Sequence, residues 1–208
     1  MALTPASPVN ASAAFNVSFA NWTDQSTPLS YAVLVDDVVV AAKSTSTSRN
    51  ITGPATPGAH TLKGRIYDAA NNYTEVTQSF TVNTAQESWR MQFYGTTANA
   101  GNAADTADPF HTGVPNLATF AVLGPNQDPA KVASGLLPQA QIIGANYGIT
   151  FTQPPGVSGV TYGAEWRADL LPGLWTSITD TGTGTTHTFS VPIGANTQMF
   201  IRLRVSTP

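Results

Sequence analysis

Short runs that alternate apolar and polar residues recur along both ends of the chain, and they restrict its fold more than any other feature. The run 14–20 places Phe15, Val17 and Phe19 on one side and polar residues on the other. Alternation with a period of two is typical of a strand with one buried face. Because turn-forming residues separate these runs at short intervals, the sequence predicts mainly antiparallel β structure.

Residues 1–83 are predicted to form an antiparallel β-sandwich. The β-rich runs 31–35 and 38–42 flank the polar pair Asp36-Asp37, a pattern that predicts a hairpin with a two-residue turn. Proline and glycine residues then mark a turn, and further alternating runs follow before residue 83. This spacing of strands and turns is typical of a sandwich of about a hundred residues or fewer.

The later part of this segment resembles bacterial immunoglobulin-like and PKD-like domains. In those domains a Pro-Gly-x-His-x-Leu strand precedes an Asp-x-x-Gly-Asn turn, and this chain has Pro57-Gly-Ala-His-Thr-Leu62 and then Asp68-Ala-Ala-Asn-Asn72. Asn71 stands where the family has glycine, and asparagine tolerates the left-handed backbone conformation of such a turn. The resemblance implies an immunoglobulin-like sandwich.

Residues 84–127 carry a helical pattern instead. Thr84 and Glu87 have the spacing of a helix capping box. A second helix is predicted to begin near Pro115, where the first turn tolerates proline, and to end at Gly124. Helices this short are not stable alone in water, so their apolar faces must pack against other elements. We therefore predict a short two-helix connector that fixes one β domain relative to the other.

The centre and end of the chain resemble a C-terminal module of large secreted proteins from Verrucomicrobia-type bacteria. The module reads Ala-Asp-x-Ala-Asp-Pro-Asp-Gly-Asp-Gly-Leu-Pro-Asn, and the corresponding segment here runs from Ala104 to Asn116. The closing run Phe200-Ile-Arg-Leu-Arg-Val205 also matches the module's final strand. Its loop is similar to the calcium loops of thrombospondin type 3 repeats, dockerins and EF-hands, in which several carboxylates converge on one cation.

The loop departs from that pattern where the metal ligands should be. Phe-His-Thr at 110–112 replaces Asp-Gly-Asp, and threonine replaces the downstream glutamate. Calcium requires six to eight oxygen ligands, several of them charged. Asp105, Asp108 and Asn116 therefore predict at most a weak calcium site, and no other cofactor is expected. The alternative is a metal-free loop with Phe110 buried in place of the ligands.

Residues 128–208 contain about five alternating runs and are predicted to form a C-terminal antiparallel β-sandwich-like domain. Three aromatic residues allow two interpretations. An exposed row of Trp166, Trp175 and Tyr147 would stack on sugar rings, as in carbohydrate-binding modules. Alternatively these side chains belong to the core, since aromatic residues dominate small cores.

No residue pattern identifies an enzyme. The histidines lie in different segments, and no Gly-x-Ser-x-Gly nucleophile motif is present. Glu165 and Asp169 are the only local carboxylate pair in the last third, and a glycosidase requires two carboxylates that face one cleft. The sequence therefore predicts a non-catalytic protein, and a stand-alone hydrolase is the least favoured of the functions considered.

Charge and cysteine content exclude several other classes of function. Nine Lys and Arg residues against twelve Asp and Glu give a net charge of -3, which does not favour nucleic-acid binding. Cysteine is absent, so disulfides and thiolate metal sites are excluded. No apolar run is long enough to span a membrane. The first residues do not have the pattern of a signal peptide, so we expect an export signal upstream in a longer parent protein.

These observations predict a structural or adhesive module of a larger exported bacterial protein, located outside the cell or at its surface. Its expected partners are the rest of the parent polypeptide, surface polysaccharide, or other copies that pair through β-sheet edges. The alternative is a carbohydrate-binding accessory module of a secreted polysaccharide-degrading enzyme.

Overall fold

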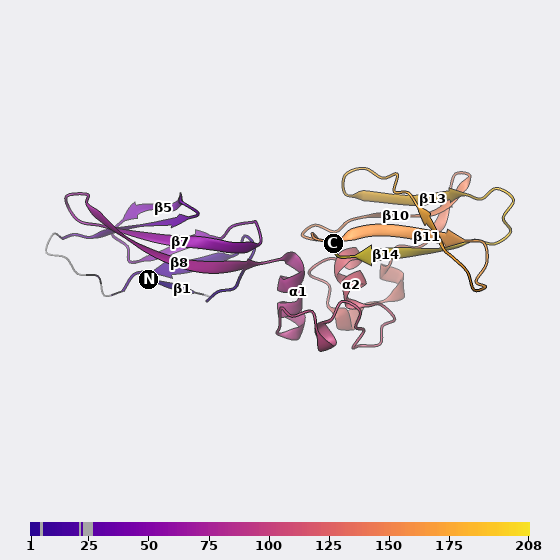
Figure 1. Cartoon of the computed structure of the whole chain (residues 1–208), viewed down its shortest axis with the longest axis horizontal. Helices are drawn as coiled ribbons and strands as arrows, with labels where there is room; N and C mark the ends of the chain where they lie inside the picture. Colours follow the sequence, from indigo (N-terminus) through magenta and orange to yellow (C-terminus); the bar gives the residue numbers. More distant parts are fainter. Residues whose placement is uncertain (5, 21, 23–26) are drawn as a thin grey trace. The chain divides into compact units, whose positions relative to one another are not determined.

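The computed structural model describes residues 1–4, 6–20, 22 and 27–208 and divides the chain into two compact units, Met1–Thr84 and Ala85–Pro208 (Figure 1). Strands account for 41% of the structure and helices for 13%. This confirms the predicted mainly β fold with a short helical segment. That segment, predicted as a connector over 84–127, lies within the second unit from Ala85 onward.

The described part of the first unit has two sheets that enclose one core. The core takes residues from both sheets, among them Phe15 and Ile51 from one and Leu62 and Phe80 from the other. The smaller sheet has the order β1 (Ala2–Thr4), β3 (Ala14–Ser18), β6 (Ser48–Thr52), and the larger has the order β2 (Val9–Asn10), β8 (Tyr73–Asn83), β7 (Gly58–Tyr67), β4 (Ser30–Val35), β5 (Val38–Ser44).

The predicted hairpin at Asp36-Asp37 is confirmed. Val35 pairs with Val38, and the two aspartates have φ values of 47° and 66°, as a two-residue turn with left-handed central residues requires.

Close packing elsewhere in the core requires a glycine. A Cβ atom at Gly64 would lie 2.4 Å from the ring of Phe19, so a larger residue there would have to displace this side chain.

The second unit contains two packed layers of strands and the helices. Its described sheets have the orders β13-β10-β9 and β12-β11-β14. Both are antiparallel throughout, as predicted for this segment. The helical elements are α1 (Ala85–Tyr94), η1 (Gly101–Ala103), α2 (Asn116–Leu123), η2 (Pro129–Lys131) and η3 (Ser134–Leu136), and the strands are β9 (Gln141–Ile143), β10 (Asn146–Thr152), β11 (Thr161–Arg167), β12 (Thr176–Ile178), β13 (Thr186–Pro192) and β14 (Phe200–Ser206).

Two apolar clusters hold the second unit together. Trp89 of α1 packs with Phe120 of α2, and both side chains are almost completely buried. Ala164 of β11 and Phe189 of β13 belong to the cluster between the sheets. The hydroxyl of Tyr162 donates a hydrogen bond of 2.6 Å to the carbonyl of Ala121, and burial raises the pKa of this tyrosine to about 12. The helices therefore pack on the sheets, as their short length requires.

A histidine–aspartate pair ties the first hairpin to strand β7. Nδ1 of His60 lies 2.6 Å from Asp36 Oδ2, and Nε2 lies 2.8 Å from the carbonyl of Thr56. Only the protonated ring can donate to both acceptors. The hydrogen bond to Asp36 raises the pKa of His60, and the amide of Thr61 together with His60 lowers the pKa of Asp36.

These shifts predict a stabilisation that depends on pH. The raised pKa of His60 stabilises the folded state below about pH 6.5, and this contribution is lost as pH rises through the folded-state value. The lowered pKa of Asp36 contributes above about pH 4 and is lost as pH falls. We expect Asp36→Asn to lower the pKa of His60, measured by NMR titration, and to reduce stability most between these two limits.

Asp37→Asn is the matched control, because Asp37 binds Lys63 at 2.6 Å. It should leave the titration of His60 unchanged. An equal effect of both substitutions on His60 would show that the hydrogen bond between His60 and Asp36 does not set its pKa.

Candidate functional site

Asp105, one of the predicted calcium ligands, lies in a polar network with helix α1. Its Oδ1 accepts hydrogen bonds of 2.6 Å from Arg90 Nη2 and 2.6 Å from Gln86 Nε2, and its Oδ2 accepts one of 3.0 Å from Asn99 Nδ2. The side chains of Arg90 and Asp105 are 6% and 13% exposed. Both carboxylate oxygens are therefore occupied by donors of the protein itself.

Asp108 closes the turn that follows. Its carboxylate accepts hydrogen bonds from the amides of Thr112, at 2.9 Å, and Gly113, at 2.7 Å. Desolvation acts to raise the pKa of Asp108, but these amide hydrogen bonds outweigh it and the pKa is lowered. Asp108 therefore caps a turn as an anion, which is the structural role predicted for it in a metal-free loop.

Asn116 connects the loop to both helices. Its Nδ2 donates to the carbonyls of Asn102, at 2.8 Å, and Ala104, at 2.9 Å, while its Oδ1 accepts a hydrogen bond of 2.5 Å from the hydroxyl of Tyr94. The residue is only 2% exposed. Its buried amide therefore has partners for both Nδ2 hydrogens and for the oxygen, as a buried polar group requires.

The loop thus brings Asp105, Asp108 and Asn116 into one segment but directs their oxygens to protein donors. The described residues contain no group of three or more His, Cys, Asp or Glu side chains that could hold a metal. The predicted burial of Phe110 is wrong, since this side chain is 47% exposed. Its ring stacks on Tyr94, 6.4 Å away, because hydrogen-bonded polar groups fill the interior of the loop.

The three aromatic residues considered for sugar stacking are in different surroundings. Trp166 packs against the cluster between the sheets together with Ala164. Trp175 lies on the other face of β11, where the guanidinium groups of Arg202 and Arg167 lie 4.2 Å and 5.6 Å from its ring centre. Tyr147 lines a separate hollow of about 310 Å³ with Ile142 and Met199. The structure does not bring these aromatic side chains together in one row.

Glu165 and Asp169, the two carboxylates considered for catalysis, form ion pairs with different arginines. Glu165 binds Arg202 at 2.8 Å and also binds Arg204. Hydrogen bonds from these two arginines lower the pKa of Glu165, the opposite of the shift that a general acid requires. Asp169 instead binds Arg167 at 3.0 Å.

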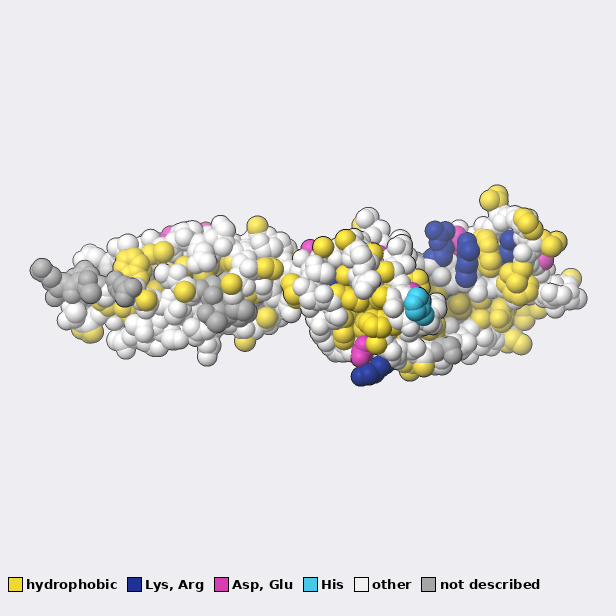
Figure 2. Space-filling model, turned by 90° about the horizontal axis from the view of Figure 1, so that it is seen from below, with side chains coloured by type: hydrophobic (Ala, Val, Ile, Leu, Met, Phe, Trp, Pro, Cys, Tyr) yellow, Lys and Arg dark blue, Asp and Glu magenta, His cyan; other side chains and the backbone are white. Residues whose placement is uncertain are grey.

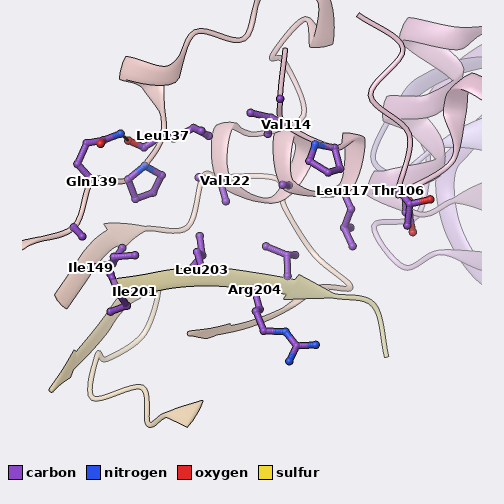
Figure 3. A pocket seen from close by; sticks show the side chains of 17 residues that line it. Thr106, Val114, Leu117, Val122, Leu137, Gln139, Ile149, Ile201, Leu203 and Arg204 are labelled. Atoms are coloured by element: carbon purple, nitrogen blue, oxygen red, sulfur yellow. Dashed lines mark hydrogen bonds between the residues drawn. The ribbon is translucent and has the colours of Figure 1, made fainter. Parts of the chain in front are cut away.

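A groove with a volume of about 680 Å³ lies between α2 and β14. In Figure 3, Val114, Leu117 and Val122 lie on the helix side and Leu203 on the strand side, while the side chain of Arg204 points away from the helix. The groove is lined mainly by apolar side chains, which are Val114, Leu117, Ala118, Val122, Leu137, Ile149, Ile201, Leu203 and Val205.

This groove has the size and apolar character of a ligand-binding pocket. The sequence did not predict it, because its walls come from segments between residues 105 and 205 that meet only in the folded unit. Figure 2 shows that hydrophobic side chains gather on one face of the second unit, with Lys and Arg side chains beside some of them. The groove is therefore the main candidate site of this unit.

Comparisons with known proteins assign no family to the chain. No protein-family profile matches it, and no curated protein is significantly similar to it. Among solved structures, the crystal structure of CopC from Methylosinus trichosporium OB3b is 20% identical and covers 39% of this chain and 89% of its own, with a TM-score of 0.27. A TM-score this low does not indicate a shared fold.

The Arg90–Asp105 pair is predicted to stabilise the second unit strongly. Asp105→Asn removes the charge that compensates the buried guanidinium of Arg90, so we expect a loss of about 3 kcal/mol in the free energy of unfolding. Asp108→Asn weakens only a turn, and we expect a clearly smaller loss. Urea denaturation followed by circular dichroism measures both. Equal losses would contradict the central role assigned to the buried pair.

Calcium is expected to have only a small effect on stability. Binding at the loop would have to break the hydrogen bonds of Asp105 and Asp108, so the site would be weak at best. A dissociation constant of about 1 mM would add only about 1.4 kcal/mol at about 10 mM calcium. We therefore expect a rise in melting temperature of no more than about 5 °C, measured by calorimetry against a chelator control. A much larger rise would show that the loop rearranges around the ion.

Proposed function

We propose that this chain is a non-catalytic structural or adhesive module of a larger exported bacterial protein, placed outside the cell or at its surface. The observation that supports this proposal is that the side chains able to bind a metal make structural hydrogen bonds within the second unit. Asp105, Asp108 and Asn116 all direct their side chains into hydrogen bonds that hold the loop, α1 and the start of α2 together. A loop of this kind serves to support a rigid fold.

The ion pairs of the β-sheet support the same role. Glu165 on β11 holds two arginines of β14, the strand beside it. Cross-strand pairs of opposite charge stabilise a sheet. The partners proposed for such a module are the rest of its parent polypeptide and other copies that pair through β-sheet edges. No helix among the described residues is both long and apolar enough to cross a membrane.

The alternative function, a carbohydrate-binding accessory module, now depends on one side chain. Trp175 is partly exposed and lies beside Arg167 and Arg202, groups that would hydrogen bond to sugar hydroxyls or carboxylates. Trp166 is partly buried and packs against the cluster between the sheets. A carbohydrate site on this unit would therefore be centred on Trp175.

Retention on immobilised polysaccharides separates the two functions. For a structural module we expect the isolated chain to elute with the void volume from neutral and acidic polysaccharide columns, and Trp175→Ala to behave identically. Retention of the wild type that is lost in Trp175→Ala, but kept in the control Tyr73→Ala, would establish the carbohydrate-binding alternative instead. Tyr73 is a suitable control because it is an exposed aromatic residue of the first unit, 53% exposed.

A further inference from the structure

We propose that the free edge of β14 and the groove beside it accept an extended polypeptide strand in which apolar residues alternate with acidic ones. The strand would extend the sheet β12-β11-β14 by pairing antiparallel to β14 and would place its apolar side chains in the groove. Addition of a strand to an exposed sheet edge is a recurrent mode of peptide recognition. This inference names a partner for the proposed structural module and rests on that function.

Strand β14 has an unprotected edge. Its seven residues all pair with β11 on one side. In the part of the chain that the structure describes, no backbone hydrogen bond joins the other side of β14 to any element. In a strand, alternate backbone N–H and C=O groups point to opposite sides, so this edge presents a row of free donors and acceptors.

The other seven-residue edge strands of the described chain are protected. Strand β5 has two register shifts against β4, and Arg49 Nη1 donates 2.8 Å to the carbonyl of Ala42. Strand β13 is covered at Thr188, whose amide donates to Asp180 and whose carbonyl accepts from the amide of Thr181. Bulges and covering groups of this kind prevent pairing with other chains. The bare edge of β14 is therefore a distinct feature of this fold.

An apolar groove lies beside this edge. The groove is bounded by α2 on one side and by Leu203 and Val205 of β14 on the other. Side chains of neighbouring strands lie next to one another on the same face of a sheet. A strand added beside β14 would therefore direct every second side chain toward Leu117 and Val122 of α2 (Figure 3). Valine, isoleucine or leucine at these positions would be removed from water.

The opposite face of the sheet carries positive charge beside the same edge. Arg202 and Arg204 alternate along β14 with Ile201, Leu203 and Val205, and their side chains are 51% and 63% exposed. Arg204 also lines the groove, but its side chain points away from α2 (Figure 3). Both arginines bind the single carboxylate of Glu165, so the three side chains together carry a net positive charge. Residues of the added strand that face this side would lie next to the arginines, and acidic residues there complete cross-strand ion pairs.

A heptapeptide in which valine alternates with glutamate tests the proposal on the whole chain. We expect saturable binding in fluorescence anisotropy, with slower hydrogen exchange of the amides of β14 and no change in those of β5. A peptide of identical composition with its valines and glutamates in separate blocks should bind at least tenfold more weakly, because it cannot fill the groove and face the arginines at once. Equal binding of both peptides, or none up to about 1 mM, would overturn the proposal.

Two variants separate the contributions of charge and groove. The double substitution Arg202→Gln and Arg204→Gln should weaken binding of the glutamate peptide about fivefold and leave a peptide with glutamine in its place unaffected. Lys131→Gln, which removes a 78% exposed cation outside the groove, should have no effect. Ala118→Phe should fill the groove and weaken both peptides. Melting temperatures verify that each variant is folded.

The peptide and polysaccharide experiments together separate failure of the strand-acceptor site from failure of the proposed structural function. Absence of peptide binding, together with no retention on polysaccharides, would overturn the strand-acceptor site and leave the structural module intact. Retention on polysaccharides that depends on Trp175 would overturn the structural function, whatever the peptides do.

Discussion

The second unit depends on one buried ion pair. Arg90 of α1 and Asp105 of the following loop are both taken out of water, and hydrogen bonds from neighbouring residues offset part of that cost. Nε of Arg90 is buried without a hydrogen-bond partner among the described residues. Gln86 and Asn99 supply donors to the carboxylate, and Asn116 ties the same loop to the start of α2. The loop therefore acts as a polar core between the helices, beside the apolar contact of Trp89 with Phe120.

The polar core also helps to fix one wall of the groove beside β14. The position of α2 is set by the loop and by the hydrogen bond from Tyr162, and α2 in turn forms one wall of the groove beside β14. A fixed wall keeps the groove open without a ligand, which lowers the entropic cost of binding an extended segment there. These features support the proposed strand-acceptor site, because a bare sheet edge adjoins an apolar groove in the described part of the second unit.

Much of the fold could be predicted from the sequence, because its signals are local. Alternation with a period of two located strands β3, β7 and β14, and the pair Asp36-Asp37 identified a two-residue hairpin turn. The missing loop carboxylates likewise indicated that Asp105 and Asp108 would serve structural roles. The burial of Phe110 was predicted wrongly, since sequence does not show that hydrogen-bonded Asn116 already fills the interior of the loop.

The sequence by itself determined the class of fold, the positions of the helices and the absence of disulfides, because each depends on residue type or on neighbours along the chain. Only the tertiary structure decided which faces of the sheets are free. It packed the partly buried Trp166 against the cluster between the sheets and placed Trp175 beside two arginines, although both lie in the same third of the chain. It also formed the groove, whose walls come from α2 and β14, because contacts between segments so distant in sequence arise only when the whole unit packs.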